Sequence, residues 1–368
     1  MPDLKLLFLS FYNLDYGIGA SASFIDQLND LPSHALAVVI EPNRIDLPRV
    51  EVKLPNTVHV EKIHLPLKGG LSFIYPFLAF FKGLKIASTL KPNIIFSMHH
   101  SFHTLSLTGH IISKILHISH VVDVHDVWRS MGLKKTKSSY LKDFLERIIV
   151  KIICHDLMIF VCSEHKKILE SRAMITFENA LILPNCVSYH LIESIKKEKH
   201  IIGKTIRFIF VGRTGSEYAL NKIYPLLNKL CSYGYKPTLL IVGHRQINTV
   251  SKYAKYIGSL SRKKTLQLIA ESDVGVGPMN PTITIPKKVV EYLVLGKIVI
   301  VGRNAVSKDI LNEWDNIIEV SETDDMNHII CRMMKMLKHV NSDNEKIEKL
   351  YCRQKIKIII GRLLPDQA

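Results

Sequence analysis

The sequence has no apolar run long enough to cross a bilayer and no closely spaced cysteine pair. A transmembrane helix needs about 18 or more apolar residues in succession, and no stretch of the chain reaches that length. The opening MPDLKLLFLSF is a short apolar run, typical of a first buried strand rather than a secretory signal. The six cysteines contain no C-x-x-C pair, which favours a reducing compartment. We therefore expect a cytoplasmic protein.

Motifs for metals and nucleic acids are also missing. There is no Asp-x-Asp motif of the kind that holds a divalent cation beside a diphosphate. The chain is rich in histidine between residues 99 and 120, but these residues form no H-E-x-x-H or similar zinc spacing. They are His99, His100, His103, His110, His117 and His120. No nucleic-acid-binding signature is recognised, so we expect neither a metal cofactor nor a nucleic-acid partner.

Positive charge is abundant and unevenly distributed. The formal net charge is +16. Residues 1–187 carry 20 Lys and Arg against 16 Asp and Glu, whereas residues 188–368 carry 29 against 17. A basic surface of this kind favours phosphate-bearing ligands or anionic lipid.

Strand-like and helix-like segments alternate along the whole chain. This rhythm predicts parallel sheets flanked by helices, and hence an α/β fold with two Rossmann-like domains facing across a cleft. Predicted strands are Leu4–Ser10, Ala35–Ile40, Asn93–Ser97, His120–Val124, Leu157–Cys162, Arg207–Val211, Thr238–Val242, Val274–Val276 and Ile298–Val301. Predicted helices are Ala20–Leu31, Phe73–Leu90, Leu105–Leu116, Tyr140–Cys154, Glu164–Ser171, Leu220–Tyr233, Ser261–Ala270, Lys287–Leu295 and a final helix, Glu345–Leu364.

A charged segment without a strand pattern, Ser188–Lys204, marks the join between the two halves. We accordingly predict an N-terminal domain over residues 1–187 and a C-terminal domain over residues 188–344. The tail, residues 345–368, is expected to return as a helix to the N-terminal domain.

The segment from Ile285 to Val301, IPKKVVEYLVLGKIVIV, predicts a phosphate-binding helix start. Pro286 suits a helix N-terminus, Gly296 suits its end, and a β-branched run typical of a buried parallel strand follows. The N–H groups and positive dipole end of such a helix can hold a phosphate. Lys287 and Lys288 oppose the dipole in the first turn, and a bound diphosphate would compensate them. A solvated basic turn is the alternative.

The order of motifs resembles that of glycosyltransferases with the GT-B fold, most closely family 4. The resemblance spans about 300 residues and has ten parts in register. They are YGIGAS, KPNIIFSMHH, VVDVHDVW, FVCSEH, ILPNCV, FIFVGR, LLIVGH, YIGSL, ESDVGVGPM and PKKVVEYLVLGK. The resemblance implies a retaining transferase with an N-terminal acceptor domain and a C-terminal domain for the nucleotide-sugar donor.

The same resemblance implies roles for individual residues. Those matched to donor binding are Gly19, Ala20, Gly212, Arg213, Lys222, Lys287, Lys288 and Glu291. His125 matches a histidine beside the anomeric carbon of the donor, and Arg213 and Lys288 match cations for the leaving diphosphate. Glu291 matches the glutamate that accepts hydrogen bonds from the ribose hydroxyls.

Two positions depart from the family pattern. Tyr218 stands where a lysine is usual, so Lys222, four residues later, is a candidate substitute. Ile283 replaces a glutamate that contacts the donor sugar. These departures keep open a catalytically silent binding subunit. A sugar-nucleotide epimerase can share the fold, but its usual His-Arg-Arg-Glu-Asn run is absent.

Two segments of the first half are candidates for membrane contact. Leu71–Ala87 is strongly apolar with two lysines, and Leu133–Phe144 adds four lysines. Such basic, amphipathic surfaces can lie on anionic lipid without crossing it. The alternative for Leu71–Ala87 is a helix buried in the domain core. A lipid-linked or glycan acceptor and peripheral attachment to the inner membrane face are therefore expectations from this region.

Overall fold

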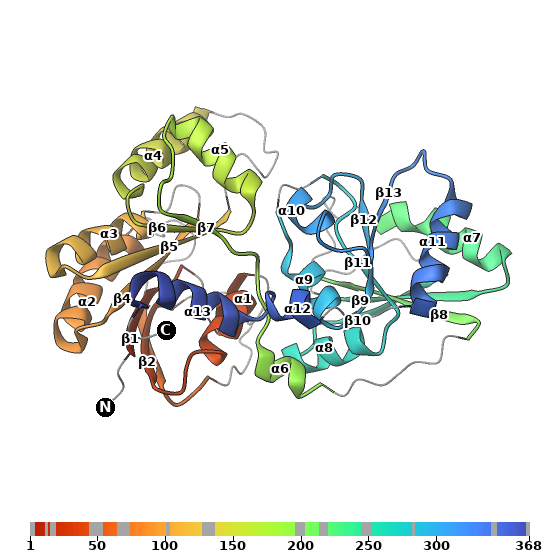
Figure 1. The fold of residues 1–368 in the computed structure, drawn as a ribbon, viewed down its shortest axis with the longest axis horizontal. Coiled ribbons are helices and arrows are strands. Elements are labelled where there is room, and N and C mark those ends of the chain that lie inside the picture. The colour runs from red at the N-terminus through yellow and green to blue at the C-terminus, as the bar shows by residue number, and fades with distance from the viewer. Residues whose placement is uncertain are drawn as a thin grey trace. The chain divides into compact units, whose positions relative to one another are not determined.

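The structure is a computed structural model that describes most of the chain. It covers residues 4–11, 14, 20–43, 54–64, 74–100, 104–126, 137–195, 203–212, 220–243, 252–281, 284–339 and 344–365. The chain divides into two compact units (Figure 1). The first comprises Met1–Pro184 together with Arg353–Ala368, and the second comprises Asn185–Cys352.

The first unit is built on a seven-stranded sheet in the order β3-β2-β1-β4-β5-β6-β7, in which every pair is parallel. Its strands are β1 (Leu4–Leu9), β2 (Ala35–Asn43), β3 (Val58–His64), β4 (Ile94–His100), β5 (Ser119–Asp126), β6 (Leu157–Phe160) and β7 (Ala180–Ile182). Central strands of this kind are buried on both faces, as the apolar sequence of β1 shows.

Helices cover both faces of this sheet. Leu6 and Phe8 of β1 pack with α1 (Ala20–Asn29), whereas Leu7 and Leu9 point the other way. That second face carries α2 (Tyr75–Leu90), α3 (Leu105–Leu116), α4 (Lys137–Ile153) and α5 (Ser163–Ala173). The alternation of side chains along a strand therefore divides the core of the unit into two layers.

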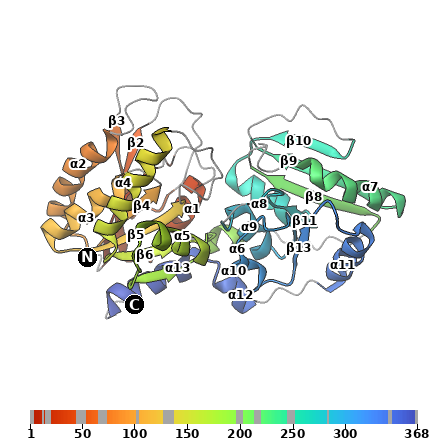
Figure 2. The same cartoon turned by 90° about the horizontal axis from the view of Figure 1, so that it is seen from above.

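The second unit has a six-stranded sheet in the order β10-β9-β8-β11-β12-β13, again parallel throughout. Its strands are β8 (Thr205–Val211), β9 (Lys236–Val242), β10 (Ala254–Gly258), β11 (Val274–Val276), β12 (Ile298–Gly302) and β13 (Ile317–Val320). Its helical segments are α6 (Tyr189–Glu193), the short 3-10 helix η3 (Leu220–Ile223), α7 (Tyr224–Ser232), α8 (Arg262–Ala270), α9 (Lys287–Val294), α10 (Lys308–Leu311), α11 (Met326–His339) and α12 (Asn344–Glu348). The two parallel sheets with alternating helices confirm the predicted α/β class (Figure 2).

The C-terminal tail forms two helices where the sequence predicts one. Helix α12 belongs to the second unit, and α13 (Cys352–Leu363) packs on the first sheet with α1. The break between them coincides with a bridge between Val187 and Tyr351, which pairs the tail with the start of the second unit. Beyond the break, the buried Lys355 ammonium lies 3.4 Å from a carboxylate oxygen of Asp123 in β5. This buried ion pair and the apolar face of α13 attach the end of the chain to the first unit.

A disulfide joins Cys186 to Cys352, close to the two points where the chain passes between the units. Both half-cystines are buried. The disulfide is at odds with the reducing compartment that the cysteine pattern favours, because disulfides are rare there. No spacing rule could reveal this pair, because the two residues are 166 positions apart. The disulfide lies beside the bridge between Val187 and Tyr351, so it connects the outgoing and returning segments of the chain.

Reduction of this disulfide is expected to destabilise the second unit. A cross-link that closes a loop of this length reduces the entropy of the unfolded chain, an effect of about 4–5 kcal/mol in the chain-entropy model. Differential scanning calorimetry with and without dithiothreitol measures it, and Cys352→Ser should lower the transition temperature in the same way. Cys331→Ser is the matched control, because Cys331 is an exposed free thiol. A transition insensitive to reductant would contradict the prediction.

Candidate functional site

The strand order of the second sheet locates a candidate binding site. The order β10-β9-β8-β11-β12-β13 reverses its direction between β8 and β11. In open parallel sheets, ligands bind outside the carboxyl ends of the strands at such a reversal. Here β8 ends at Val211 and β11 ends at Val276, so the site is expected next to the residues that follow these two strands.

At this edge of the sheet, glycines allow neighbouring backbone segments to approach each other closely. Gly212 has φ +129°, a conformation that side chains disfavour, and its N–H donates to the carbonyl of Val242. A Cβ added to Gly243 would lie 1.8 Å from the carbonyl oxygen of Gly212. The Gly243 N–H in turn donates to the carbonyl of Gly258. The carboxyl ends of β8, β9 and β10 thus carry Gly212, Gly243 and Gly258, here called the glycine floor, and a side chain at position 243 would force β8 and β9 apart.

Helix α9 begins at the same corner and brings a cation with it. The Nζ of Lys288 lies 4.0 Å from the centroid of the Phe210 ring, and a Cβ on Gly212 would meet that Nζ at 2.7 Å. Pro286 occupies the N-cap of α9, and among the described residues no side chain caps the helix. The ammonium and the positive end of the helix dipole therefore meet at one corner, which is the physical requirement for binding an anion.

Tyr292 of α9 fixes the two strand ends that border the corner. Its hydroxyl oxygen accepts a hydrogen bond from the Val211 N–H at 3.1 Å and donates to the Val276 carbonyl at 3.4 Å. The ring occupies the space beside Gly275, where a Cβ would lie 2.3 Å from it. This positioning role of Tyr292 was not predicted from the sequence. The signal was a tyrosine in an otherwise aliphatic helix face, together with a glycine inside the neighbouring strand.

Glu291 is buried and has a protein partner. Its Oε1 accepts a hydrogen bond from the Nη1 of Arg262 in α8 at 2.6 Å, and only about 3% of the residue is exposed. The sequence predicts Glu291 as a ribose ligand but gives no sign of Arg262. The pairing provides the counter-charge that a buried carboxylate requires. In this structure Glu291 therefore joins α9 to α8 behind the corner.

Two further predicted cations lie in different settings. Lys287 is half-buried in the first turn of α9, directly before Lys288. Lys222 lies in the 3-10 helix, and its Nζ is 3.5 Å from an Oε1 of Glu322, a largely exposed residue. The structure thus brings Gly212, Lys287 and Lys288 to the corner, whereas Lys222 pairs with an acidic group.

The other predicted site residues are described only in part. Gly19, Arg213, Tyr218 and Ile283 lie outside the described residues. Ala20 is the first residue of α1. His125 and Asp126 end β5, at the carboxyl edge of the first sheet, with only their backbone described. The strand thus runs two residues beyond its predicted end at Val124, and the side-chain roles of His125 and Asp126 stay predictions.

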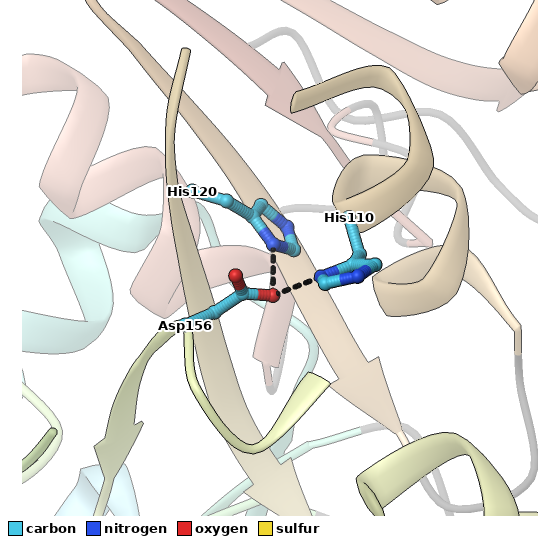
Figure 3. A group of neighbouring side chains, drawn as sticks. All are labelled: His110, His120 and Asp156. Atoms are coloured by element: carbon cyan, nitrogen blue, oxygen red, sulfur yellow. Dashed lines mark hydrogen bonds and ion pairs between the residues drawn. The ribbon is translucent and has the colours of Figure 1, made fainter. Parts of the chain in front are cut away.

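The first unit also contains a compact group of titratable side chains, His110, His120 and Asp156 (Figure 3). Oδ2 of Asp156 lies 2.7 Å from Nδ1 of His110 and 2.8 Å from Nδ1 of His120. The ionised carboxylate can only accept, so both Nδ1 atoms donate. His120 Nε2 then accepts from the Ser97 hydroxyl at 2.7 Å. Both histidines belong to the histidine-rich stretch noted in the sequence, whereas Asp156 was not predicted to join them.

This group is better described as a hydrogen-bond network than as a metal site. Zinc binds ligand atoms at about 2.0–2.2 Å, which in a tetrahedral site separates them by roughly 3.3 Å. Here the two nitrogen–oxygen distances are 2.7 Å and 2.8 Å, the ordinary lengths of charge-assisted hydrogen bonds. The network connects α3 and β5 to the turn before β6, near the amino end of β5. It therefore lies away from the edge where ligands bind.

The network predicts a specific loss of stability in acid. Burial lowers the pKa of His120, outweighing the opposing effect of Asp156. Burial alone would raise the pKa of Asp156, but hydrogen bonds and charge from His120 and His110 lower it. Both groups have folded-state pKa values below their unfolded values, so their contributions are present at pH 7. They are lost as the pH falls below about 6.5 for His120 and about 4 for Asp156.

The measurement is the melting temperature between pH 7 and pH 4. Wild type should lose stability progressively, and His120→Gln should flatten the part of the curve just below pH 6.5. His34→Gln is a control, because His34 is exposed. Identical slopes for wild type and His120→Gln would show that the neutral, buried imidazole is not the cause.

Comparison with known proteins supports the fold. No protein-family model matches the chain, and no curated protein sequence matches it. Among solved structures, sucrose-phosphate synthase from Thermosynechococcus elongatus has a TM-score of 0.68 at 11% identity and covers 99% of both chains. A glycosyltransferase from Rickettsia africae has a TM-score of 0.67 at 12% identity over 98% of both.

An epimerase also shares the architecture. UDP-GlcNAc 2-epimerase from Methanocaldococcus jannaschii has a TM-score of 0.54 at 13% identity, covering 97% of this chain and 99% of its own. Identities this low establish a common fold and nothing more. The chain therefore has the two-sheet α/β architecture of GT-B proteins.

Proposed function

We propose that this protein is a glycosyltransferase that moves a sugar from a nucleoside-diphosphate sugar to a glycan or lipid-linked acceptor. The observation that carries the proposal is the corner where Gly212, Gly243 and Lys288 meet at the start of α9. It lies at the reversal of strand order in a fold shared with proteins that act on or bind UDP-sugars, among them UDP-GlcNAc 2-epimerase. A diphosphate is the ligand that best fits a glycine floor, an ammonium group and an uncapped helix start together.

The chemistry of sugar transfer requires what this corner offers. When the bond between the sugar and the diphosphate breaks, negative charge grows on the leaving phosphate. Fixed positive groups at that point stabilise the transition state more than the ground state. Lys288 and the N-terminal N–H groups of α9 fill that role in the proposal. Arg213, which follows β8 directly in the sequence, is a further candidate.

We further propose a retaining reaction without a metal ion. The resemblance in sequence motifs suggests retention, with the leaving phosphate taking the proton of the acceptor hydroxyl. No general base is therefore assigned, and His125 is placed beside the anomeric carbon on the strength of its motif. Gly19 and Ala20 complete the proposed donor contacts. Lys222 and Glu291 would join them only by exchanging their present partners, Glu322 and Arg262, for the donor. Activity that is unchanged by EDTA would support this part, whereas strict magnesium dependence would contradict it.

The second unit is the proposed donor domain, and the first unit, including β5 and its terminal His125, the proposed acceptor domain. This division follows from the phosphate corner, which is formed entirely by residues of the second unit. We place the enzyme in the cytoplasm, where nucleotide sugars are available, and at the membrane surface if its acceptor is lipid-linked.

Two alternatives lead to different outcomes. A silent subunit would bind nucleotide or glycan without transfer, and the family departures at Tyr218 and Ile283 are what favour it. An epimerase would convert a nucleotide sugar with no acceptor present, and one structural neighbour has that activity. The absence of a His-Arg-Arg-Glu-Asn run speaks against the epimerase.

A thermal-shift screen against nucleoside diphosphates and nucleotide sugars tests the proposal. A ligand that binds only the folded state increases the free energy of unfolding, by about 2.7 kcal/mol at a hundredfold excess over Kd, and so raises the melting temperature. We expect one nucleotide base to give a clear shift, and incubation with its sugar derivative to release the diphosphate only when an acceptor is supplied. No shift with any nucleotide would refute the proposed donor site.

A further inference from the structure

The outer faces of α2, α3 and α4 expose an unusual amount of apolar surface. These helices lie side by side on one face of the first sheet (Figures 1 and 2). Ten large hydrophobic side chains on them are exposed by 40–62%, out of fifteen such residues in the described part of the chain. The ten, here called the apolar face, are Phe77, Phe81, Ile111, Ile115, Tyr140, Leu141, Phe144, Leu145, Ile148 and Ile152. Clustered exposed apolar side chains mark interaction surfaces.

Helix α4 buries its acidic side chains and exposes apolar ones, unlike an ordinary surface helix. Its two acidic residues, Asp143 and Glu146, are buried and form ion pairs with Arg172 of α5. Its exposed side carries six residues of the apolar face at spacings of one, three or four along the helix. A surface helix normally turns its charges to water and its apolar stripe to the core. In α4 the acidic side chains are buried and six apolar side chains are exposed. Contact with water alone does not account for this distribution.

The exposed charges that α2, α3 and α4 themselves carry are positive. Helices α2 and α3 contain no Asp or Glu, and the only two in α4 are the buried pair. Among the described side chains, Lys85, Lys114 and Lys151 are exposed on these three helices. Lys82 and Arg147 are half-exposed and have acidic partners, Glu61 and Asp143. The surface therefore combines apolar side chains with exposed cations.

We infer that this face binds the surface of an anionic lipid bilayer. Apolar side chains gain free energy by entering the boundary between headgroups and acyl chains, and nearby lysines are attracted to anionic headgroups. No described helix is long and apolar enough to cross a bilayer, so the protein would lie on the surface. A second copy of the chain is a poorer occupant, because a two-fold contact would place the lysines of one face against those of the other.

The face also has an orientation relative to the sheet. In a parallel sheet the crossover helices run antiparallel to the strands, so their N-terminal ends lie near the carboxyl ends of the strands. Six residues of the apolar face lie in the first halves of α2 and α4, and four lie in the second halves of α3 and α4. Docking on lipid would therefore lay these helices along the membrane, with the larger share of the apolar contacts toward the edge where β5 ends. This step rests on the proposed function, since that edge carries the proposed acceptor site.

Vesicle co-sedimentation of the full chain tests the inference. Phosphatidylcholine vesicles with and without phosphatidylglycerol are compared at low and high salt. We expect binding to anionic vesicles that weakens with salt, because the lysine contribution is screened. The double variant Leu141→Glu/Phe144→Glu should reduce the partition coefficient by about tenfold or more, since it removes two side chains that enter the lipid. Ile358→Glu is the matched control, on α13 at the opposite face of the same sheet.

Each outcome of the vesicle experiment either supports or refutes lipid binding by the apolar face. Equal recovery with neutral and anionic vesicles at both salt concentrations would overturn the inference, as would unchanged binding of the double variant. Concentration-dependent dimerisation abolished by the double variant, without vesicle binding, would assign the face to a second copy. A nucleotide thermal shift measured on the same samples separates the two proposals. Nucleotide binding without vesicle binding refutes only the lipid surface, and the reverse result refutes only the donor site.

Discussion

Replacing Lys288 with Gln is expected to lower kcat by about 10²–10³-fold while the protein remains folded. The Lys288 ammonium lies over the Phe210 ring and against Gly212, at the start of α9. Gln keeps much of the length of the side chain but removes the charge. Because the leaving phosphate gains charge in the transition state, the loss should fall mainly on kcat and less on KM for the donor.

The matched control is Lys263→Gln. Lys263 is exposed and is the second residue of the neighbouring helix α8, as Lys288 is of α9. A general effect of removing a positive charge from the first turn of a helix would appear in both variants, whereas a leaving-group role would appear only at Lys288. Steady-state kinetics and a melting curve of each variant separate the two. Wild-type turnover in Lys288→Gln would remove the main support for the site.

Replacing Gly243 with Ala is expected to destabilise the second unit and to weaken nucleotide binding together. The new methyl group would lie 1.8 Å from the backbone oxygen of Gly212, so β8 and β9 must separate at their carboxyl ends. Forcing extra volume into a packed region costs about 1–3 kcal/mol. The displaced Gly212 also borders Lys288, so the phosphate corner is distorted as well.

Gly203→Ala provides the control for this substitution. A Cβ at Gly203 meets nothing within 4 Å, and its backbone does not lie in the left-handed region. We expect its melting temperature and its nucleotide Kd to match those of wild type. For Gly243→Ala we expect a melting temperature lower by several degrees and a clearly weaker Kd. Equal behaviour of the two variants would mean that the close approach of β8 and β9 is unimportant.

The interior of both sheets could be predicted from the sequence, but the edges could not. All nine strands predicted from apolar runs are present, and they occupy the interior of the two sheets. The four unpredicted strands, β3, β7, β10 and β13, are the four sheet edges. Of these, β3, β7 and β10 are partly exposed, whereas β13 is mostly buried but only four residues long. A reading based on continuous apolar runs misses them because their sequences are mixed.

The site was predictable where one segment of the sequence determines it. The order Pro286, two lysines and a terminating glycine places a helix start at a strand end, and the structure has this arrangement. Contacts between distant segments were not predictable. No local pattern encodes the contact of Arg262 with Glu291, which are 29 positions apart. The same holds for Tyr292 and Gly275, which are 17 positions apart. The pairing of Cys186 with Cys352 belongs to the same class.

The exposure of the apolar face could not be predicted from the sequence for a different reason. From the sequence, Leu71–Ala87 is either a helix buried in the core or a surface in contact with membrane, and the structure divides the described part of the segment between the two. Tyr75 and Ala79 are buried, whereas Phe77 and Phe81 are exposed. Periodicity could distinguish two faces of the helix but not which of two apolar faces meets the core. That choice depends on how α2 packs against the sheet and α3.

A crystal structure of the protein with the nucleoside diphosphate selected by thermal shift tests the central claim most directly. We predict phosphate oxygens within hydrogen-bond distance of the Lys288 ammonium and of backbone N–H groups in the first turn of α9. A diphosphate bound at another place, with Lys288 still against the Phe210 ring and no ligand contact, would contradict it.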